Sequence, residues 1–156
     1  MTVSRRLEEL GLTLPAVARP VAAYVPAMRV GNLVHTSGQL PTSDGQVVCE
    51  GRLGTRAVTE PQAVEAARVA ALNALAAAAD VAGGVDNLER VVKVTGYVAS
   101  TEDFFAQPSI IDGASNLFQD LFGSPHARAA VGVVALPLNV CVEIEAVFEV
   151  RSDVEA

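Results

Sequence analysis

Residues 140–150 read VCVEIEAVFEV, a run in which apolar and polar side chains alternate. Successive side chains of a strand point to opposite sides, so alternation over this length predicts a β-strand with one apolar and one polar face. Val142 and Ile144 fall on the apolar face, whereas Glu143 and Glu145 fall on the polar face. The run therefore predicts a sheet whose apolar face is covered by other elements.

A second strand is predicted just before this one, over residues 127–135, which read ARAAVGVVA. We expect the two strands to pair as a hairpin, in a register set by burial of their apolar faces. Arg128, Ala130 and Gly132 then lie on the same sheet face as Glu143. In a symmetric hairpin Arg128 and Glu143 are about 13 Å apart along the strands, so a site that used both would need a subunit interface.

Two helices are predicted between the strands. Thr59 can cap the first helix and Gln62 can complete a capping box, while Gly83 ends it. The second helix is predicted over residues 108–122, with apolar side chains at helical spacing. The small residues of the first helix predict close packing against a sheet.

The remaining segments complete the order ββαβαββ, an α+β fold with two helices on one face of a mixed sheet. Strands are predicted over 24–30, 33–37 and 90–100, and residues 1–20 predict a short helix followed by an extended arm. A length of 156 residues fits a single domain, 1–156.

Charge and composition argue against several classes of partner. The net charge is −7 and no run of Lys and Arg is present, which argues against nucleic acid as a partner. The sequence has neither an apolar run long enough to span a membrane nor the apolar stretch of a signal peptide, so we expect no membrane association and a cytoplasmic location.

Metals and cofactors are not expected. Cys49 and Cys141 are far apart in the sequence and match no zinc spacing, and His35 and His126 stand alone. Two such cysteines fit a reducing compartment and do not predict a disulfide framework. Neither a dinucleotide-binding fingerprint nor a P-loop is present.

Four side chains are candidates for chemistry. Arg128 stands among small neighbours and can hold a carboxylate with two hydrogen bonds, or it can be a surface arginine paired with a glutamate. Glu143 can position water or move a proton, or it can be an ordinary polar residue of an amphipathic strand. Tyr24 and Ser37 share a face of the first hairpin and can donate hydrogen bonds into a pocket, or they can be structural.

Three stretches resemble the RidA (YjgF) family. They are residues 31–41, which read GNLVHTSGQLP, residues 90–95, and residues 127–137 followed by 142–146. The resemblance implies a chorismate-mutase-like fold and a homotrimer with small-molecule clefts between subunits. It also implies cofactor-free hydrolysis of reactive 2-imino (enamine) acids to 2-oxo acids and ammonia.

The resemblance also implies roles for single residues. Arg128 matches the arginine that binds the substrate carboxylate, and Glu143 matches the glutamate that orients the attacking water. Tyr24 and Ser37 match residues that line the cleft. Ala130 falls where the family archetype has a cysteine, so the thiol is missing, but its backbone can still offer a hydrogen bond for substrate binding. The loop over 42–59, the stretch 112–116 and the arm up to about residue 20 depart from the family pattern.

Three functions follow from these observations. The first is an imine deaminase acting on a small carboxylate substrate. The second is a non-catalytic module that senses a small carboxylate metabolite, which needs Arg128 but not Glu143. The third is an endoribonuclease, against which the acidic charge argues.

Overall fold

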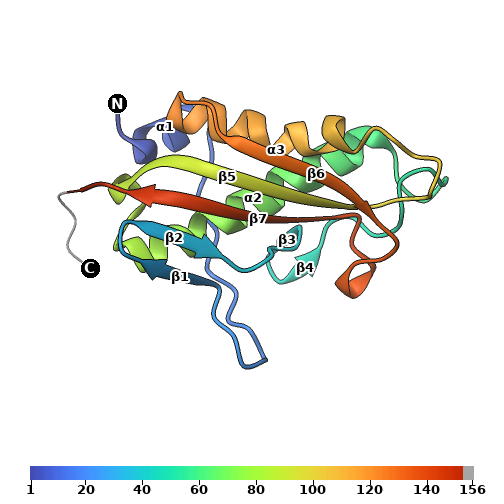
Figure 1. Ribbon diagram of the computed structural model, residues 1–156, viewed down its shortest axis with the longest axis horizontal. Helices are drawn as coiled ribbons and strands as arrows, with labels where there is room; N and C mark the ends of the chain where they lie inside the picture. The colour runs from blue at the N-terminus through green and yellow to red at the C-terminus, as the bar shows by residue number, and fades with distance from the viewer. Residues whose placement is uncertain (153–156) are drawn as a thin grey trace.

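The computed structural model describes residues 1–152 and has one main sheet of five strands. Two long helices, α2 and α3, lie on the same face of this sheet (Figure 1). In spatial order the strands are β1 (Ala27–Val30), β2 (Leu33–Thr36), β7 (Val142–Val150), β5 (Leu88–Ala99) and β6 (Ala127–Val133). The helices are α2 (Glu60–Ala82) and α3 (Gln107–Phe122). The predicted order ββαβαββ and the α+β class are therefore confirmed.

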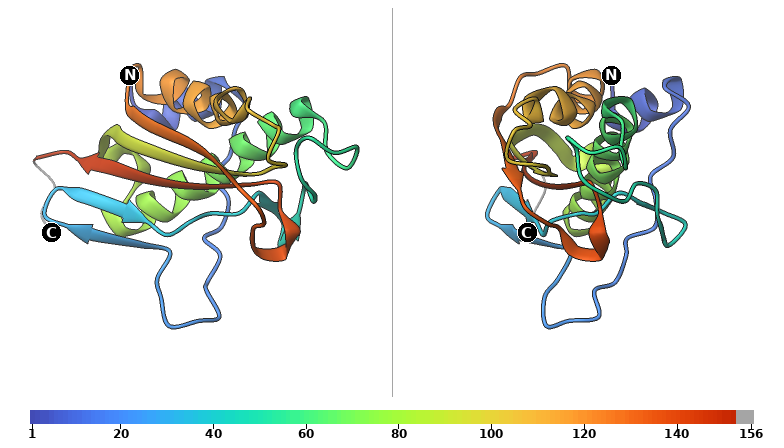
Figure 2. Two further views of the ribbon diagram at one scale, coloured as in Figure 1. Left: turned by 45° about the vertical axis from the view of Figure 1, so that its right-hand side comes forward. Right: turned by 90° about the vertical axis from the view of Figure 1, so that its right-hand side faces the viewer.

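Several smaller elements accompany the main sheet and its two long helices. They are α1 (Val3–Glu9), the two-stranded hairpin β3 (Thr42–Ser43) and β4 (Gln46–Val47), and the 3-10 turns η1 (Val85–Asn87) and η2 (Pro137–Asn139). The short helix α1 lies beside α3 in Figure 2. Ser4 anchors it, because its backbone N–H and its hydroxyl both donate to the Asp86 carboxylate, at 2.8 and 2.7 Å.

The helices form where the sequence predicts them. Thr59 and Gln62 make the reciprocal hydrogen bonds of a capping box, and Gly83 ends α2 in the left-handed conformation. The inward face of α2 is almost entirely alanine, so α3 can approach it closely. At the crossing, Gly113 of α3 lies directly against the Val64 carbonyl oxygen, where no Cβ would fit.

The alternation in β7 is confirmed. Its even-numbered residues are buried under the helices, while its odd-numbered residues lie on the uncovered face, hereafter the open face. In β5 the alternation breaks at an irregularity between Val91 and Lys93. Val91 is therefore buried and Val92 is exposed, so strict alternation does not extend to the start of this strand.

The predicted hairpin between the last two strands is wrong. β6 pairs with β5 in parallel and lies at the edge of the sheet, whereas β7 lies between β2 and β5 and runs antiparallel to both. The physical reason is the β5–α3–β6 unit: a strand, a helix and a returning strand form a parallel crossover, which puts β6 beside β5. The chain then crosses over through η2 to reach the centre of the sheet.

This topology also changes the sheet faces. Arg128, Ala130 and Gly132 are level with Val94, Gly96 and Val98 of β5, which point toward the helices. They therefore occupy the helix-covered face and not the face that carries Glu143, contrary to the sequence-based expectation. None of the helices in residues 1–152 combines the length and apolar character that a membrane span requires.

Candidate active site

Arg128 is anchored at the free edge of the sheet. Its guanidinium reaches α3, where Nη1 lies 2.7 Å from Asp112 Oδ1 and 3.3 Å from Ser115 Oγ. The Arg128 side chain retains 27% of its exposure. Within residues 1–152, Nε and Nη2 of Arg128 have no hydrogen-bond partner, so one edge of the planar guanidinium is held and the other can bind a carboxylate.

A histidine extends this cluster. Ser115 Oγ lies 3.0 Å from Nε2 of His126, and Nδ1 of His126 is buried without a partner in the described part of the chain. Burial, and then the charge of Arg128, lower the pKa of His126. The imidazole is therefore neutral at physiological pH. These side chains show no link in the sequence, because only the turn between α3 and β6 brings them together.

Glu143 lies on the open face of the sheet, level with Tyr97 of β5. The carboxylate is half-buried, and no side chain in residues 1–152 hydrogen-bonds or ion-pairs with it. Burial, and then the neighbouring charge of Glu145, raise the pKa of Glu143. Gly38 leaves the space that the Glu143 carboxylate occupies, since a Cβ there would overlap it.

Glu145 has a different environment. The Tyr97 hydroxyl donates to Glu145 Oε1 at 2.8 Å, and this hydrogen bond is the main reason that the pKa of Tyr97 is raised. Glu143 and Glu145 lie on the same sheet face. The carboxylate of Glu145 therefore has a hydrogen-bond partner within the chain, and the carboxylate of Glu143 remains available for chemistry.

Tyr24 and Ser37 lie beyond the end of the first hairpin. β1 starts only at Ala27, so Tyr24 belongs to the loop before the strand and the expectation that it lies in a strand is wrong. The Ser37 hydroxyl donates to the Val25 carbonyl at 2.6 Å and ties this loop to the sheet. Tyr24 is 58% exposed and lines a cavity of about 240 Å³ together with Gly38. The structure thus brings Tyr24 and Ser37 to the Glu143 end of the sheet.

Ala130 lies with Arg128 instead. It is level with Gly96, half-buried and packed against the core on the helix-covered face. Its side chain offers no group for chemistry, so only its place beside Arg128 connects it with the site.

The two halves of the predicted site are separate within one chain. Arg128 is level with Val94 and Glu143 with Tyr97, three residues further along β5, and β5 itself runs between them. At about 3.3 Å per residue and about 4.8 Å between strands, their Cα atoms are roughly 14 Å apart. They also point to opposite faces of the sheet, so one chain cannot offer both groups to one small molecule.

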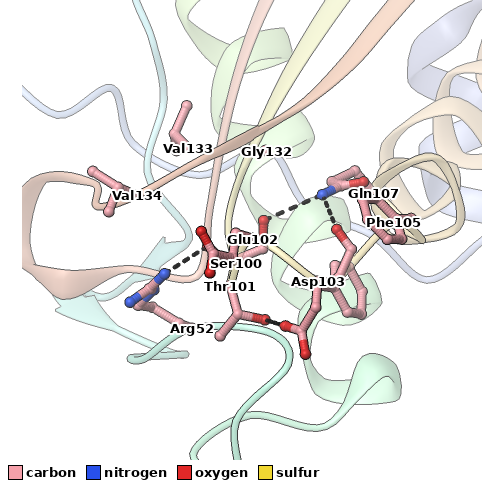
Figure 3. A pocket seen from close by; sticks show the side chains of 11 residues that line it. Arg52, Ser100, Thr101, Glu102, Asp103, Phe105, Gln107, Gly132, Val133 and Val134 are labelled. Atoms are coloured by element: carbon pink, nitrogen blue, oxygen red, sulfur yellow. Dashed lines mark hydrogen bonds between the residues drawn. The ribbon is translucent and has the colours of Figure 1, made fainter.

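A cavity of about 760 Å³ opens further along β6, between its end and the start of α3 (Figure 3). Arg52 Nη2 donates to the Ser100 carbonyl at 2.8 Å, while Arg52 Nε is buried without a partner in the described part of the chain. Gln107 donates to Ser100 Oγ at 3.3 Å, directly over Gly132. Gly132 follows Ala130 on the same face, so this polar cavity continues the Arg128 side of the sheet. This cavity was not predicted from the sequence, because its residues come from three distant segments.

The comparisons with known proteins identify the family. The family model described as Endoribonuclease L-PSP matches residues 15–150, so the chain belongs to this family, that of the RidA and YjgF proteins. Protein TCP17 of Trypanosoma cruzi is 40% identical over 96% of this chain and 95% of its own length. A 2-iminobutanoate/2-iminopropanoate deaminase of Dermatophagoides farinae is 33% identical over 90% and 95%.

Solved structures agree with this assignment. The crystal structure of Atu1372, a protein of unknown function from Agrobacterium tumefaciens, superimposes with a TM-score of 0.86 at 43% identity. The match covers 96% of this chain and 92% of that one. The family resemblance inferred from the sequence is therefore confirmed.

Proposed function

We propose that the protein hydrolyses reactive 2-imino acids to 2-oxo acids and ammonia, in a cleft between copies of the chain. The observation that supports this proposal is the environment of two side chains, Arg128 and Glu143. Arg128 has a free guanidinium edge and Glu143 has a half-buried carboxylate without a partner in residues 1–152. The name of the mite relative supports the choice of reaction.

The chemistry follows from the two groups. Arg128 binds the substrate carboxylate through its free edge and so fixes the imine carbon. Glu143 accepts a proton from water as the water oxygen bonds to that carbon, and the C=N electron pair moves to nitrogen. Glu143 returns this proton to the nitrogen, which gives a tetrahedral amino alcohol. Glu143 then takes the proton of the new hydroxyl and passes it to the amine nitrogen as the C–N bond breaks, so that ammonia leaves and the carbonyl forms. A raised pKa suits Glu143 to both transfers near neutral pH.

A second copy must complete this site, and we propose the homotrimer that the family resemblance implies. The open face carries exposed apolar side chains at Met28, Val30 and Val131, which are 59%, 64% and 41% exposed. Ala127 and Ala129 of β6 add small residues to the same face. Packing of copies through this face would bury these side chains. Light scattering coupled to size-exclusion chromatography should give three times the chain mass, and a monomer would contradict the proposal.

The activity is tested with imino acids generated in situ by an amino-acid oxidase and trapped by semicarbazide. Wild-type protein should suppress the trapping, and Arg128→Ala should abolish the suppression. Glu143→Gln should lower kcat by roughly 100- to 10,000-fold, the usual range for loss of a general base. Arg90→Ala, which removes an exposed ion pair with Glu149, is the matched control and should stay active. Full activity of Arg128→Ala would refute the assignment.

The family description also names a ribonuclease, so the same preparations should be incubated with RNA. We expect no cleavage, because the acidic chain offers no run of basic residues. Cleavage that is lost in Arg128→Ala would favour a nuclease in place of the deaminase.

A further inference from the structure

The fold brings its two cysteines face to face. Cys49 follows β4 and Cys141 directly precedes β7. Glu50 and Val140 form an antiparallel bridge, and the Cys141 N–H donates to the Cys49 carbonyl at 3.3 Å. Cys49 and Cys141 are therefore directly opposite each other across this bridge, although the sequence analysis treated them as isolated.

This arrangement places the two cysteines at the backbone spacing that disulfides use. Opposed residues at a hydrogen-bonded antiparallel position have Cα atoms about 5.5 Å apart, and disulfides occur at roughly 4.4 to 6.8 Å. Side chains of opposed residues also point to the same side. Burial, and then the neighbouring Cys49 side chain, raise the pKa of Cys141.

We propose that Cys49 and Cys141 form a redox modification site, at which a peroxide converts the two thiols into a reversible disulfide. Cys49 is half-buried, whereas Cys141 is fully buried, so the oxidant reaches Cys49 first. This inference does not depend on the proposed deaminase activity.

The reaction balances with hydrogen peroxide as the oxidant. The Cys49 sulfur attacks one peroxide oxygen and the O–O bond breaks, which leaves a Cys49 sulfenic acid and one water. The Cys141 sulfur then attacks the Cys49 sulfur, the S–O bond breaks, and hydroxide leaves with the Cys141 proton as a second water. Two electrons pass from the thiols to the peroxide, and a dithiol reductant reverses the change.

The disulfide would have a structural consequence near the candidate site. Cys141 stands two residues before Glu143 on the same run of chain. A bond to Cys49 would fix the segment after β4 covalently to the start of β7. It would also close a long loop of the unfolded chain, which raises the melting temperature.

The test uses the full chain, fully reduced and then treated with hydrogen peroxide in slight excess. Thiol titration should show the loss of both thiols, and mass spectrometry should show the loss of two hydrogens and a peptide that links residues 49 and 141. The melting temperature should rise by several degrees, and dithiothreitol should restore the thiols and the original value.

Cys49→Ser is the matched control, because a half-buried side chain tolerates the change better than the core residue Cys141. In this variant Cys141 should keep its thiol under the same treatment and the melting temperature should not rise. Retention of both thiols by the wild type would overturn the proposal. So would a sulfinic or sulfonic acid at Cys49 beside a free Cys141, or a dimer linked through Cys49.

Discussion

The contacts of Arg128 with α3 position its guanidinium and would compete with the carboxylate that we propose it binds. Asp112 and Ser115 fix one edge of the guanidinium, which favours a planar, two-point contact with a carboxylate on the other edge. At the same time the Asp112 carboxylate neutralises part of the charge that attracts the substrate. Asp112 is 52% exposed, so this competition is weak.

Asp112→Asn should therefore strengthen substrate binding while the amide oxygen still accepts from Arg128. An exposed ion pair is worth about 0.2 to 1 kcal/mol, so KM should fall by a factor of about 1.4 to 5 with little change in kcat. Steady-state kinetics would measure this, with Asp120→Asn, on the same helix, as the control. A loss of kcat in correctly folded Asp112→Asn would show that the full negative charge is needed to position Arg128.

The raised pKa of Glu143 leads to a prediction about stability as well as activity. Its pKa is raised in the folded protein, first by burial and then by Glu145. The stability that the protonated acid contributes is present below the ordinary pKa of glutamate and is lost as the pH rises through the raised pKa. At neutral pH the folded chain therefore holds an unfavourable carboxylate.

Glu143→Gln should accordingly melt at a higher temperature than wild type at neutral pH. The gap should close as the pH falls below the ordinary range of a glutamate, because wild type is then protonated too. Thermal unfolding followed by circular dichroism across pH would show this, with the exposed Glu102→Gln as the control. A lower melting temperature at neutral pH would mean that the Glu143 carboxylate is stabilising and has a partner.

At the scale of elements, periodicity and capping predicted most of the fold. The capping box of Thr59 and Gln62, the glycine stop at Gly83 and the alternation of β7 are local signals, and all three are confirmed. Strand pairing is not local. Consecutive strands were expected to pair, but the β5–α3–β6 crossover places β6 beside β5 and leaves the centre of the sheet to β7.

Non-local pairing also limited what could be predicted about the candidate site. Arg128 and Glu143 were predicted from the sequence by their residue types and the family resemblance, and their roles stay predictions. The sheet faces on which these two residues lie were not predicted correctly, because the face depends on which strand is the neighbour. Asp112, Ser115 and His126 were missed, since only the packing of α3 against the β6 edge brings them to Arg128.

The crossing of α2 and α3 depends on one glycine. An alanine at Gly113 would place its Cβ against the Val64 carbonyl oxygen, a backbone atom that cannot turn aside. Gly113→Ala should therefore lower the free energy of unfolding by about 1 to 3 kcal/mol, the usual cost of overpacking. Urea denaturation would measure the loss, with Gln119→Ala on the exposed side of α3 as the control. Unchanged stability would show that the helices can move apart freely.

For the whole molecule, the sheet separates the two groups that we propose to react. Arg128 faces the helices at one edge, while Glu143 faces the open side near the centre, roughly 14 Å away by strand spacing. The open face carries exposed apolar side chains, which packing against other copies of the chain would bury. For the proposed reaction, each cleft must therefore take Arg128 from one copy and Glu143 from its neighbour.

This requirement is tested most directly by mixing two inactive variants. Arg128→Ala and Glu143→Gln chains, each inactive alone, should regain imine hydrolysis when they are co-expressed and purified as mixed assemblies. Random mixing in a ring leaves about one quarter of the clefts with both native groups, so activity near that fraction of wild type is expected. Mixed assemblies that remain inactive would contradict a site shared between copies.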